Sequence, residues 1–196
     1  MRSYGKIIPD LVIDGVPAPY GVVNEREIRA VAGIMIVLGL TAFFGVFYEK
    51  NVALAFWIVL AFWGDFVLKV FIGPEWSYFG RIGAWIVHRQ KPEYVGAIQK
   101  RFAWSIGLVL SSIVLILIGK IFLFSSGTCG ASALGLSSCF FPMLLCSVCL
   151  FFMWLESAAG ICVGCQVYSW LLDKGWIEKP AYRPACPGGV CSIEKH

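Results

Sequence analysis

Residues 30–48 read AVAGIMIVLGLTAFFGVFY, and Thr41 is the only polar side chain in this stretch before the final tyrosine. An uncharged run of this length can cross the hydrocarbon core of a bilayer as one α-helix, which needs about 20 residues. Arg26 and Arg29 stand just before it. The stretch predicts a first membrane span over residues 29–48 and makes lipid the solvent of the fold.

Three further apolar runs complete the predicted membrane domain. The second is broken only by Asp65 and Lys69, the third follows a basic segment, and the fourth lies near the end of the chain. In lipid every backbone polar group must be bonded internally, so such runs form helices. We therefore predict an all-α integral membrane protein with four transmembrane helices, over residues 29–48, 52–72, 102–124 and 139–170.

The composition supports the same class. Of 196 residues, 59% are hydrophobic and 14% are charged, whereas an ordinary soluble domain has about 25% charged residues. The net charge of +4 comes from basic residues in short segments between the apolar runs, where they act as topology signals. No basic face with interleaved aromatic residues is present, so the expected partner is membrane lipid and not nucleic acid.

The segment between the second and third spans has an amphipathic pattern. Phe79, Ile82, Trp85 and Ile86 recur at intervals of three and four residues among basic side chains. This spacing predicts a short helix that lies in the headgroup region of the membrane.

The basic residues also predict an orientation. Those before the first span, those between the second and third spans and those after the fourth all fall on one side, which should be the cytoplasmic side. The chain then divides into a cytoplasmic N-terminal segment (1–27), a four-helix membrane domain (28–172) and a cytoplasmic tail (173–196). Ile28-Arg29-Ala30 and Arg101-Phe102-Ala103 also open two hairpins about 73 residues apart, as parallel repeats would.

Eight cysteines fall into four local pairs. Paired sulfurs suit disulfide, dithiol or metal chemistry, because two sulfurs must come close together to bond or to share one ion. The pairs are Cys129 with Cys139, Cys146 with Cys149, Cys162 with Cys165, and Cys186 with Cys191.

Cys162-Val163-Gly164-Cys165 is the sharpest of these motifs. Two intervening residues allow both sulfurs to sit on one helical turn. If a helix restarts after Gly160, the partial charge at its N-terminus would favour a thiolate there. The alternative is that both cysteines are small apolar residues of a packed core.

The other pairs have different surroundings. Cys186 and Cys191 lie in a polar tail, which favours thiol chemistry and makes them a candidate exchange partner for Cys165. Packing explains Cys146 and Cys149 within the fourth span. Cys129 and Cys139 are candidates for a structural disulfide on the outer side of the membrane.

Two further expectations concern the fourth span. On an unbroken helix, Cys149 and Cys162 would lie about 20 Å apart, so exchange between them would need a mobile partner such as a quinone, a small thiol or a thioredoxin-like protein. Glu156 stands alone in the span and is either a proton acceptor for a thiol or the ionic partner of Lys69 or Arg101.

Asp65 and Lys69 are four residues apart on one face of the second span. This spacing predicts an ion pair that offsets the cost of holding each charge in lipid, with a polar cavity as the alternative. No phosphate-binding loop, nucleophile elbow or zinc-protease motif occurs in the sequence.

The segment from Glu156 to Tyr168 resembles the bacterial membrane family catalogued as domain of unknown function 4395, whose members end in a Gly-apolar-Cys-x-Gly-Cys-x-x-Tyr stretch. Three other segments are similar to the family and extend the resemblance over roughly residues 23–172. They are Asn24-Glu25-Arg26-Glu27-Ile28-Arg29-Ala30, Tyr78-Phe79-Gly80-Arg81 and Gln99-Lys100-Arg101-Phe102-Ala103.

The resemblance implies a location in the bacterial inner membrane and a shared importance for Cys162 and Cys165. It also implies an association with thioredoxin-like or sulfurtransferase proteins. The family carries no assigned activity or cofactor. The cysteines outside the Cys-x-x-Cys motif depart from its pattern and inherit no role from it.

We therefore predict a membrane thiol-disulfide redox or sulfur-transfer protein that uses Cys162 and Cys165 at the cytoplasmic face, within reach of the aqueous phase. One alternative is a transporter of small sulfur species along Asp65, Lys69 and Glu156. The other is a non-catalytic structural subunit, in which Cys162, Cys165, Cys186 and Cys191 could hold zinc.

Overall fold

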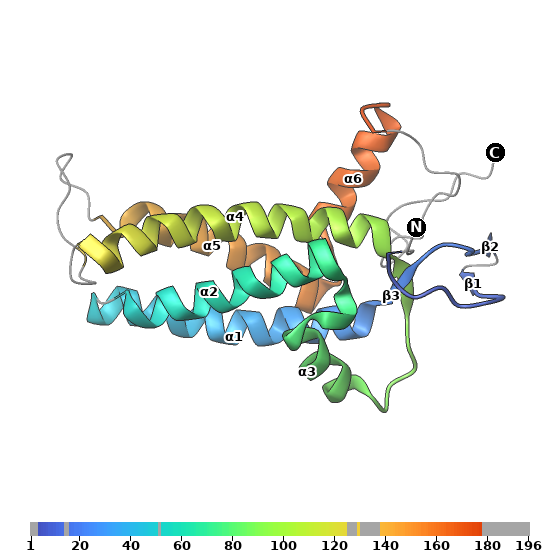
Figure 1. Ribbon diagram of the computed structural model, residues 1–196, viewed down its shortest axis with the longest axis horizontal. Coiled ribbons are helices and arrows are strands. Elements are labelled where there is room, and N and C mark those ends of the chain that lie inside the picture. The colour runs from blue at the N-terminus through green and yellow to red at the C-terminus, as the bar shows by residue number, and fades with distance from the viewer. Residues whose placement is uncertain (1–3, 14–15, 51, 125–128, 130–137, 178–196) are drawn as a thin grey trace.

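Four long helices build the molecule (Figure 1), which is a computed structural model that describes residues 4–13, 16–50, 52–124, 129 and 138–177. They are α1 (Glu25–Glu49), α2 (Ala53–Val67) with a π-helical extension (Leu68–Ile72), α4 (Ala97–Phe124), and α5 (Phe140–Trp154) with a π-helical extension (Leu155–Ala159). Each of the four is long and apolar enough to cross a membrane. The predicted class, an all-α membrane protein with four spans, is confirmed.

Shorter elements gather at one end of this bundle (Figure 1). Two strands, β1 (Val12–Ile13) and β2 (Val16–Pro17), pair with each other, and β3 (Val22–Asn24) pairs antiparallel with β4 (Tyr94–Gly96). The helices α3 (Tyr78–Val87) and α6 (Val163–Asp173) project sideways from the bundle at the same end. A 3₁₀ turn (Pro74–Trp76) precedes α3.

The same order of elements occurs twice along the chain. Strand β3 leads into α1, and α2 then ends in a π-helical turn, a glycine (Gly73) and the short helix α3. Strand β4 leads into α4, and α5 likewise ends in a π-helical turn, a glycine (Gly160) and the short helix α6. The repeated order agrees with the two hairpins expected from the sequence.

The interior of the bundle holds two apolar clusters, and its outer surface is also apolar. Met35, Phe62 and Trp104 belong to the cluster nearer to α3 and α6. On the outside, Trp57 is 60% exposed and Val109 is 58% exposed. Large apolar side chains on the surface are costly in water but not in lipid, so this pattern suits a membrane protein.

A helix lies in the predicted amphipathic segment, as α3. Its Phe79 is buried against the bundle, whereas Ile82, Trp85 and Ile86 are exposed. Three apolar side chains therefore point away from the protein interior. The placement of α3 in the headgroup region stays a prediction.

The fourth span differs from the expected helix over residues 139–170. The helix ends at Ala159, and Gly160 adopts a left-handed conformation with φ of 69°. The Arg29 side chain donates hydrogen bonds to the carbonyl oxygens of Ser157 and Ala158, which the helix end leaves without helical partners. A new helix, α6, begins at Val163. The hydropathy of the chain continues through this break and so conceals it.

Replacement of Gly160 tests whether this break depends on glycine. Gly160→Ala should destabilise the protein by about 1–2 kcal/mol, because an L-residue is strained in the left-handed region. The added Cβ would also lie 3.2 Å from the Arg29 guanidinium. Denaturant unfolding in detergent measures the effect.

Gly45→Ala is the matched control, since Gly45 lies within α1 and an added Cβ would make only an ordinary contact, at 3.7 Å from Leu54. It should be neutral or stabilising. Equal destabilisation by the two substitutions would contradict the role assigned to Gly160.

Candidate thiol site

Cys162 and Cys165 meet at the N-terminus of α6. Cys162 is the residue that precedes the first turn of the helix, and Cys165 lies within that turn. Their Sγ atoms are 2.7 Å apart, and the Cys165 thiol donates a hydrogen bond to the Cys162 sulfur. A disulfide bond is about 2.05 Å long, so a small movement would bring the two sulfurs to bonding distance.

The packing of α6 against the start of α4 holds the pair in place. Gly164 lies so close to Ala103 that an added Cβ would come within 2.5 Å of the Ala103 Cβ. One turn further on, the ring of Tyr168 packs against Phe102, with 5.5 Å between the ring centroids. A glycine between the two cysteines is therefore what allows the first turn of α6 to approach α4.

This packing also closes the sulfurs to water. Cys162 is 6% exposed and Cys165 is 1% exposed. The expectation that both sulfurs are reachable from the aqueous phase is therefore wrong for this conformation. The sequence places the motif next to a charged segment but gives no sign that α6 folds back over it.

A buried cluster of charges lies beside the two sulfurs. The Lys100 ammonium is 2.7 Å from a carboxylate oxygen of Glu25 and 2.8 Å from one of Glu156. The side chain of Lys100 is fully buried, and that of Glu25 is 2% exposed. The ammonium also interacts electrostatically with the sulfurs of both cysteines.

Glu156 is thus paired, but with neither of the partners expected from the sequence. Lys69 forms its ion pair with Asp65 instead. Arg101 donates a hydrogen bond to the carbonyl oxygen of Val70, at 3.0 Å, and stacks on the ring of Tyr4, at 4.7 Å. Lys100 and Arg101 are neighbours in the sequence but point to different sides of α4, and Lys100 is the one that faces Glu156.

Lys100 and Glu25 were not among the site residues expected from the sequence. Both lie at the starts of apolar runs, where charged residues mark the membrane boundary. Lys100 and Glu25 could have been identified from the resemblance, because they lie in two of the segments that resemble the family, Asn24 to Ala30 and Gln99 to Ala103.

The two cysteines differ in their surroundings. The hydrogen bond to Cys162, together with burial, raises the pKa of the Cys165 thiol far above its ordinary value, although Lys100 acts in the opposite direction. Cys165 therefore stays protonated at neutral pH and donates to Cys162.

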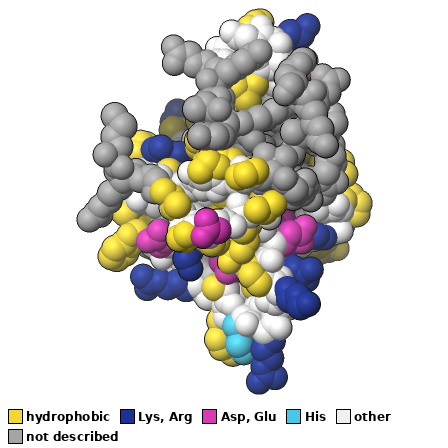
Figure 2. All heavy atoms as spheres, turned by 90° about the vertical axis from the view of Figure 1, so that its right-hand side faces the viewer, with side chains coloured by type: hydrophobic (Ala, Val, Ile, Leu, Met, Phe, Trp, Pro, Cys, Tyr) yellow, Lys and Arg dark blue, Asp and Glu magenta, His cyan; other side chains and the backbone are white. Residues whose placement is uncertain are grey.

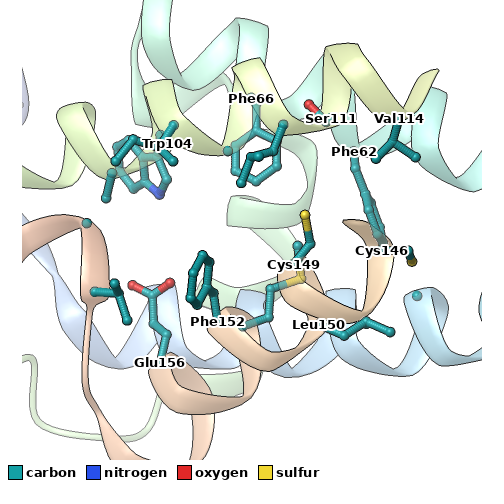
Figure 3. Close-up of a pocket in the computed structure, with 18 of the residues that line it drawn as sticks. Phe62, Phe66, Trp104, Ser111, Val114, Cys146, Cys149, Leu150, Phe152 and Glu156 are labelled. Atoms are coloured by element: carbon teal, nitrogen blue, oxygen red, sulfur yellow. The ribbon is translucent and has the colours of Figure 1, made fainter. Parts of the chain in front are cut away.

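Cys162 also borders a cavity of about 290 Å³ that is lined by α1, α2, α4, α5 and the start of α6. Cys146, Cys149 and Glu156 line the same cavity. Figure 3 shows the sulfur of Cys149 and the carboxylate of Glu156 directed into it. Because α5 and α6 are separate helices, the expected separation of Cys149 and Cys162 along one unbroken helix does not apply.

The remaining predicted residues lie away from this site. Asp65 and Lys69 form a buried ion pair of 2.6 Å, and Asp65 also accepts hydrogen bonds from Ser77 and Phe79 at the start of α3. Cys129 and Cys139 are joined by a disulfide.

Two of the predicted cysteines, Cys186 and Cys191, lie outside the described residues, as does residue range 178–196 of the predicted tail. Within the part of the chain that the structure describes, no group of three or more His, Cys, Asp or Glu residues is placed to hold a metal ion. The zinc hypothesis included the tail cysteines and stays a prediction.

Removal of the Lys100 charge tests the buried cluster. Lys100→Met leaves two buried carboxylates without their cation, so it should destabilise the protein by about 3–5 kcal/mol in detergent unfolding. A triple variant that also carries Glu25→Gln and Glu156→Gln removes all three charges and should recover most of that loss. No difference between the single and triple variants would argue against the ion cluster.

Comparison with known proteins supports the resemblance noted in the sequence. The family model described as "Domain of unknown function (DUF4395)" matches residues 23–172. The comparisons with curated proteins and with solved structures gave no match. The matched range contains all four spans, the charge cluster and both cysteines of the thiol site. The chain therefore belongs to the family known as domain of unknown function 4395.

Proposed function

We propose that this membrane protein carries out thiol-disulfide redox or sulfur-transfer chemistry, in which Cys162 and Cys165 cycle between a dithiol and a disulfide or persulfide. The observation that carries the proposal is the distance of 2.7 Å between the two Sγ atoms at the start of a helix. Nearby positive charge activates a thiol, because it favours the thiolate form that is the nucleophile. The helix N-terminus and the Lys100 ammonium both supply positive charge here.

The residues around the pair fit distinct roles. Cys162 attacks one sulfur of a substrate disulfide and forms a mixed disulfide, and the first substrate thiol leaves. Cys165 then attacks the Cys162 sulfur, so the second substrate thiol leaves with the proton of Cys165. The protein ends as a disulfide, and the substrate ends as two thiols. Lys100 stabilises the thiolate. Glu156, 2.8 Å from Lys100, accepts the proton that Cys162 loses and passes it to the first substrate thiol as it leaves.

We further propose that the protein lies in the bacterial inner membrane with both termini in the cytoplasm. Figure 2 views the end of the bundle that carries α3 and α6, where Lys and Arg side chains surround the described surface. Positive charge is retained on the cytoplasmic side. The Cys129–Cys139 disulfide is near the other end, where the Cys129 N–H bonds to the carbonyl oxygen of Lys50. A disulfide there suits an oxidising exterior.

Thiol chemistry explains the geometry better than transport along Asp65, Lys69 and Glu156. Asp65 and Lys69 bind each other and do not line the cavity that Cys162 and Glu156 share. The contacts of Asp65 with Ser77 and Phe79 instead attach α3 to α2. A thioredoxin-like or sulfurtransferase protein remains a proposed partner, as does the tail pair Cys186 and Cys191.

A redox titration with differential alkylation and mass spectrometry tests this function. Cys162 and Cys165 should titrate together as one two-electron couple, and Cys165→Ser should trap a mixed disulfide between Cys162 and a small thiol such as glutathione. In the reduced protein, Cys162 should be alkylated before Cys165, because the hydrogen bond to Cys162 and burial raise the pKa of the Cys165 thiol.

Cys146→Ser and Cys149→Ser are the matched controls, since both residues line the same cavity and neither takes part in the proposed couple. Neither should alter the titration of Cys162 and Cys165. The function would be refuted if the two sulfurs never oxidised as a pair.

A further inference from the structure

The cavity beside Cys162 has mostly apolar walls. It is lined by residues of α1, α2, α4, α5 and the start of α6, which include the aromatic side chains of Phe62, Phe66 and Phe152. Its volume of about 290 Å³ is close to the lower end of the range of cavities that bind small organic molecules, about 300–1,000 Å³. An apolar ring with a short apolar substituent therefore fits both the size and the chemistry of this space.

One end of the cavity is polar. Trp104, Glu156 and Cys162 all line it. Figure 3 shows the indole nitrogen of Trp104 and the carboxylate of Glu156 directed into the space between them. A ligand at this end would meet a hydrogen-bond donor and an acidic side chain, and the sulfur of Cys162 borders the same cavity.

The surroundings favour a ligand that arrives from the membrane. Cys162 and Cys165 are closed to water, being 6% and 1% exposed, but Cys162 borders the cavity. The α5 span forms one wall, and only 6% of its most apolar window is buried, compared with 28% for the α4 span. Among the four described spans, the α5 span is thus the one with the smallest buried share.

We propose that this cavity binds a lipid-soluble quinone, which accepts two electrons from the dithiol of Cys162 and Cys165. The inference rests on the proposed thiol-redox function and names a quinone, in place of a substrate disulfide, as the oxidant of the pair. A quinone has an apolar ring that suits the aromatic walls and carbonyl oxygens that accept hydrogen bonds, as from the Trp104 N–H. It is also a two-electron acceptor that dissolves in lipid, which matches a dithiol that is closed to water and borders a mostly apolar cavity.

The reaction balances without a further reactant. The Cys162 thiolate attacks the quinone ring, and its proton goes to Glu156. Cys165 then attacks the Cys162 sulfur, the sulfur–sulfur bond forms, and the bond between Cys162 and the ring breaks with its electron pair on the ring. The proton of Cys165 and the proton held by Glu156 complete the quinol. Two thiols and one quinone thus give one disulfide and one quinol.

The test uses the reduced full-length protein in nanodiscs, without oxygen, with decylubiquinone as the probe. We expect one quinol per protein together with a Cys162–Cys165 disulfide, measured by absorbance and by mass spectrometry. Cys149→Phe places a large ring in the cavity and should raise the quinone concentration for half-maximal rate by about tenfold or more.

Val148→Phe is the control for added bulk, because Val148 neighbours Cys149, is 39% exposed and does not line the cavity. It should behave as the unmodified protein does. Should Cys149→Phe fail to fold, photolabelling of the unmodified protein with an azido-quinone replaces it. Labels on α4 and α5 beside the cavity would support the proposal, and labels only elsewhere would overturn it.

A water-soluble oxidant, diamide, separates this inference from the function on which it rests. If diamide joins Cys162 to Cys165 but decylubiquinone does not, the quinone proposal is wrong and the thiol function survives. The quinone proposal is also wrong if decylubiquinone oxidises the pair equally fast in Cys149→Phe. If neither oxidant produces the disulfide, both proposals fail together.

Discussion

The ion cluster of Lys100 with Glu25 and Glu156 is the interaction on which the thiol end of the bundle depends. A lone ammonium or carboxylate in a lipid-embedded fold costs several kcal/mol, so the three side chains must stay together. They come from the start of α1, the start of α4 and the end of the α5 span, and their contacts of 2.7 and 2.8 Å fix these three ends relative to one another.

The ammonium of Lys100 also interacts with both sulfurs of the thiol site. A Cys162 thiolate and the Glu156 carboxylate therefore compete for one cation, and a proton passed from Cys162 to Glu156 keeps the charge around Lys100 constant.

The two halves of the chain put different chemistry at matching positions. Ser77 precedes the first turn of α3 just as Cys162 precedes that of α6, and Gly80 and Cys165 follow three residues later. Ser77 caps its helix by accepting from the Gly80 N–H and donates to Asp65. The side chains of Ser77 and Asp65 are paired through hydrogen bonds and an ion pair. They therefore anchor α3 and present no reactive group. In the second half, the same helix start carries two sulfurs and faces a cavity.

The sequence was sufficient for features that depend on local pattern. Length and hydropathy define the four spans, and a spacing of four residues predicts the pair of Asp65 and Lys69. It was not sufficient where tertiary contacts decide. Gly160 could kink a helix or end it, and the Arg29 side chain, which is distant in sequence, stabilises the end. Lys100 and Arg101 read alike as boundary charges, yet the helix turns only Lys100 inward. The α6 helix covers the sulfurs because Gly164 packs closely against Ala103. The spacing of residues along the chain does not predict this contact.

Burial of the sulfurs restricts how any redox partner can reach them. Exchange requires a second sulfur to approach the attacked sulfur to about 2 Å, and a soluble thiol protein could not do so while α6 covers the pair. Such a partner would have to displace α6, which is joined to the fourth span through the left-handed Gly160 and carries the exposed Trp170 on its outer side. A small lipid-soluble acceptor in the cavity needs no such movement, because Cys162 already borders that space. A redox partner from water would therefore reach the two sulfurs from the side that α6 covers. A partner from lipid would reach them from the cavity.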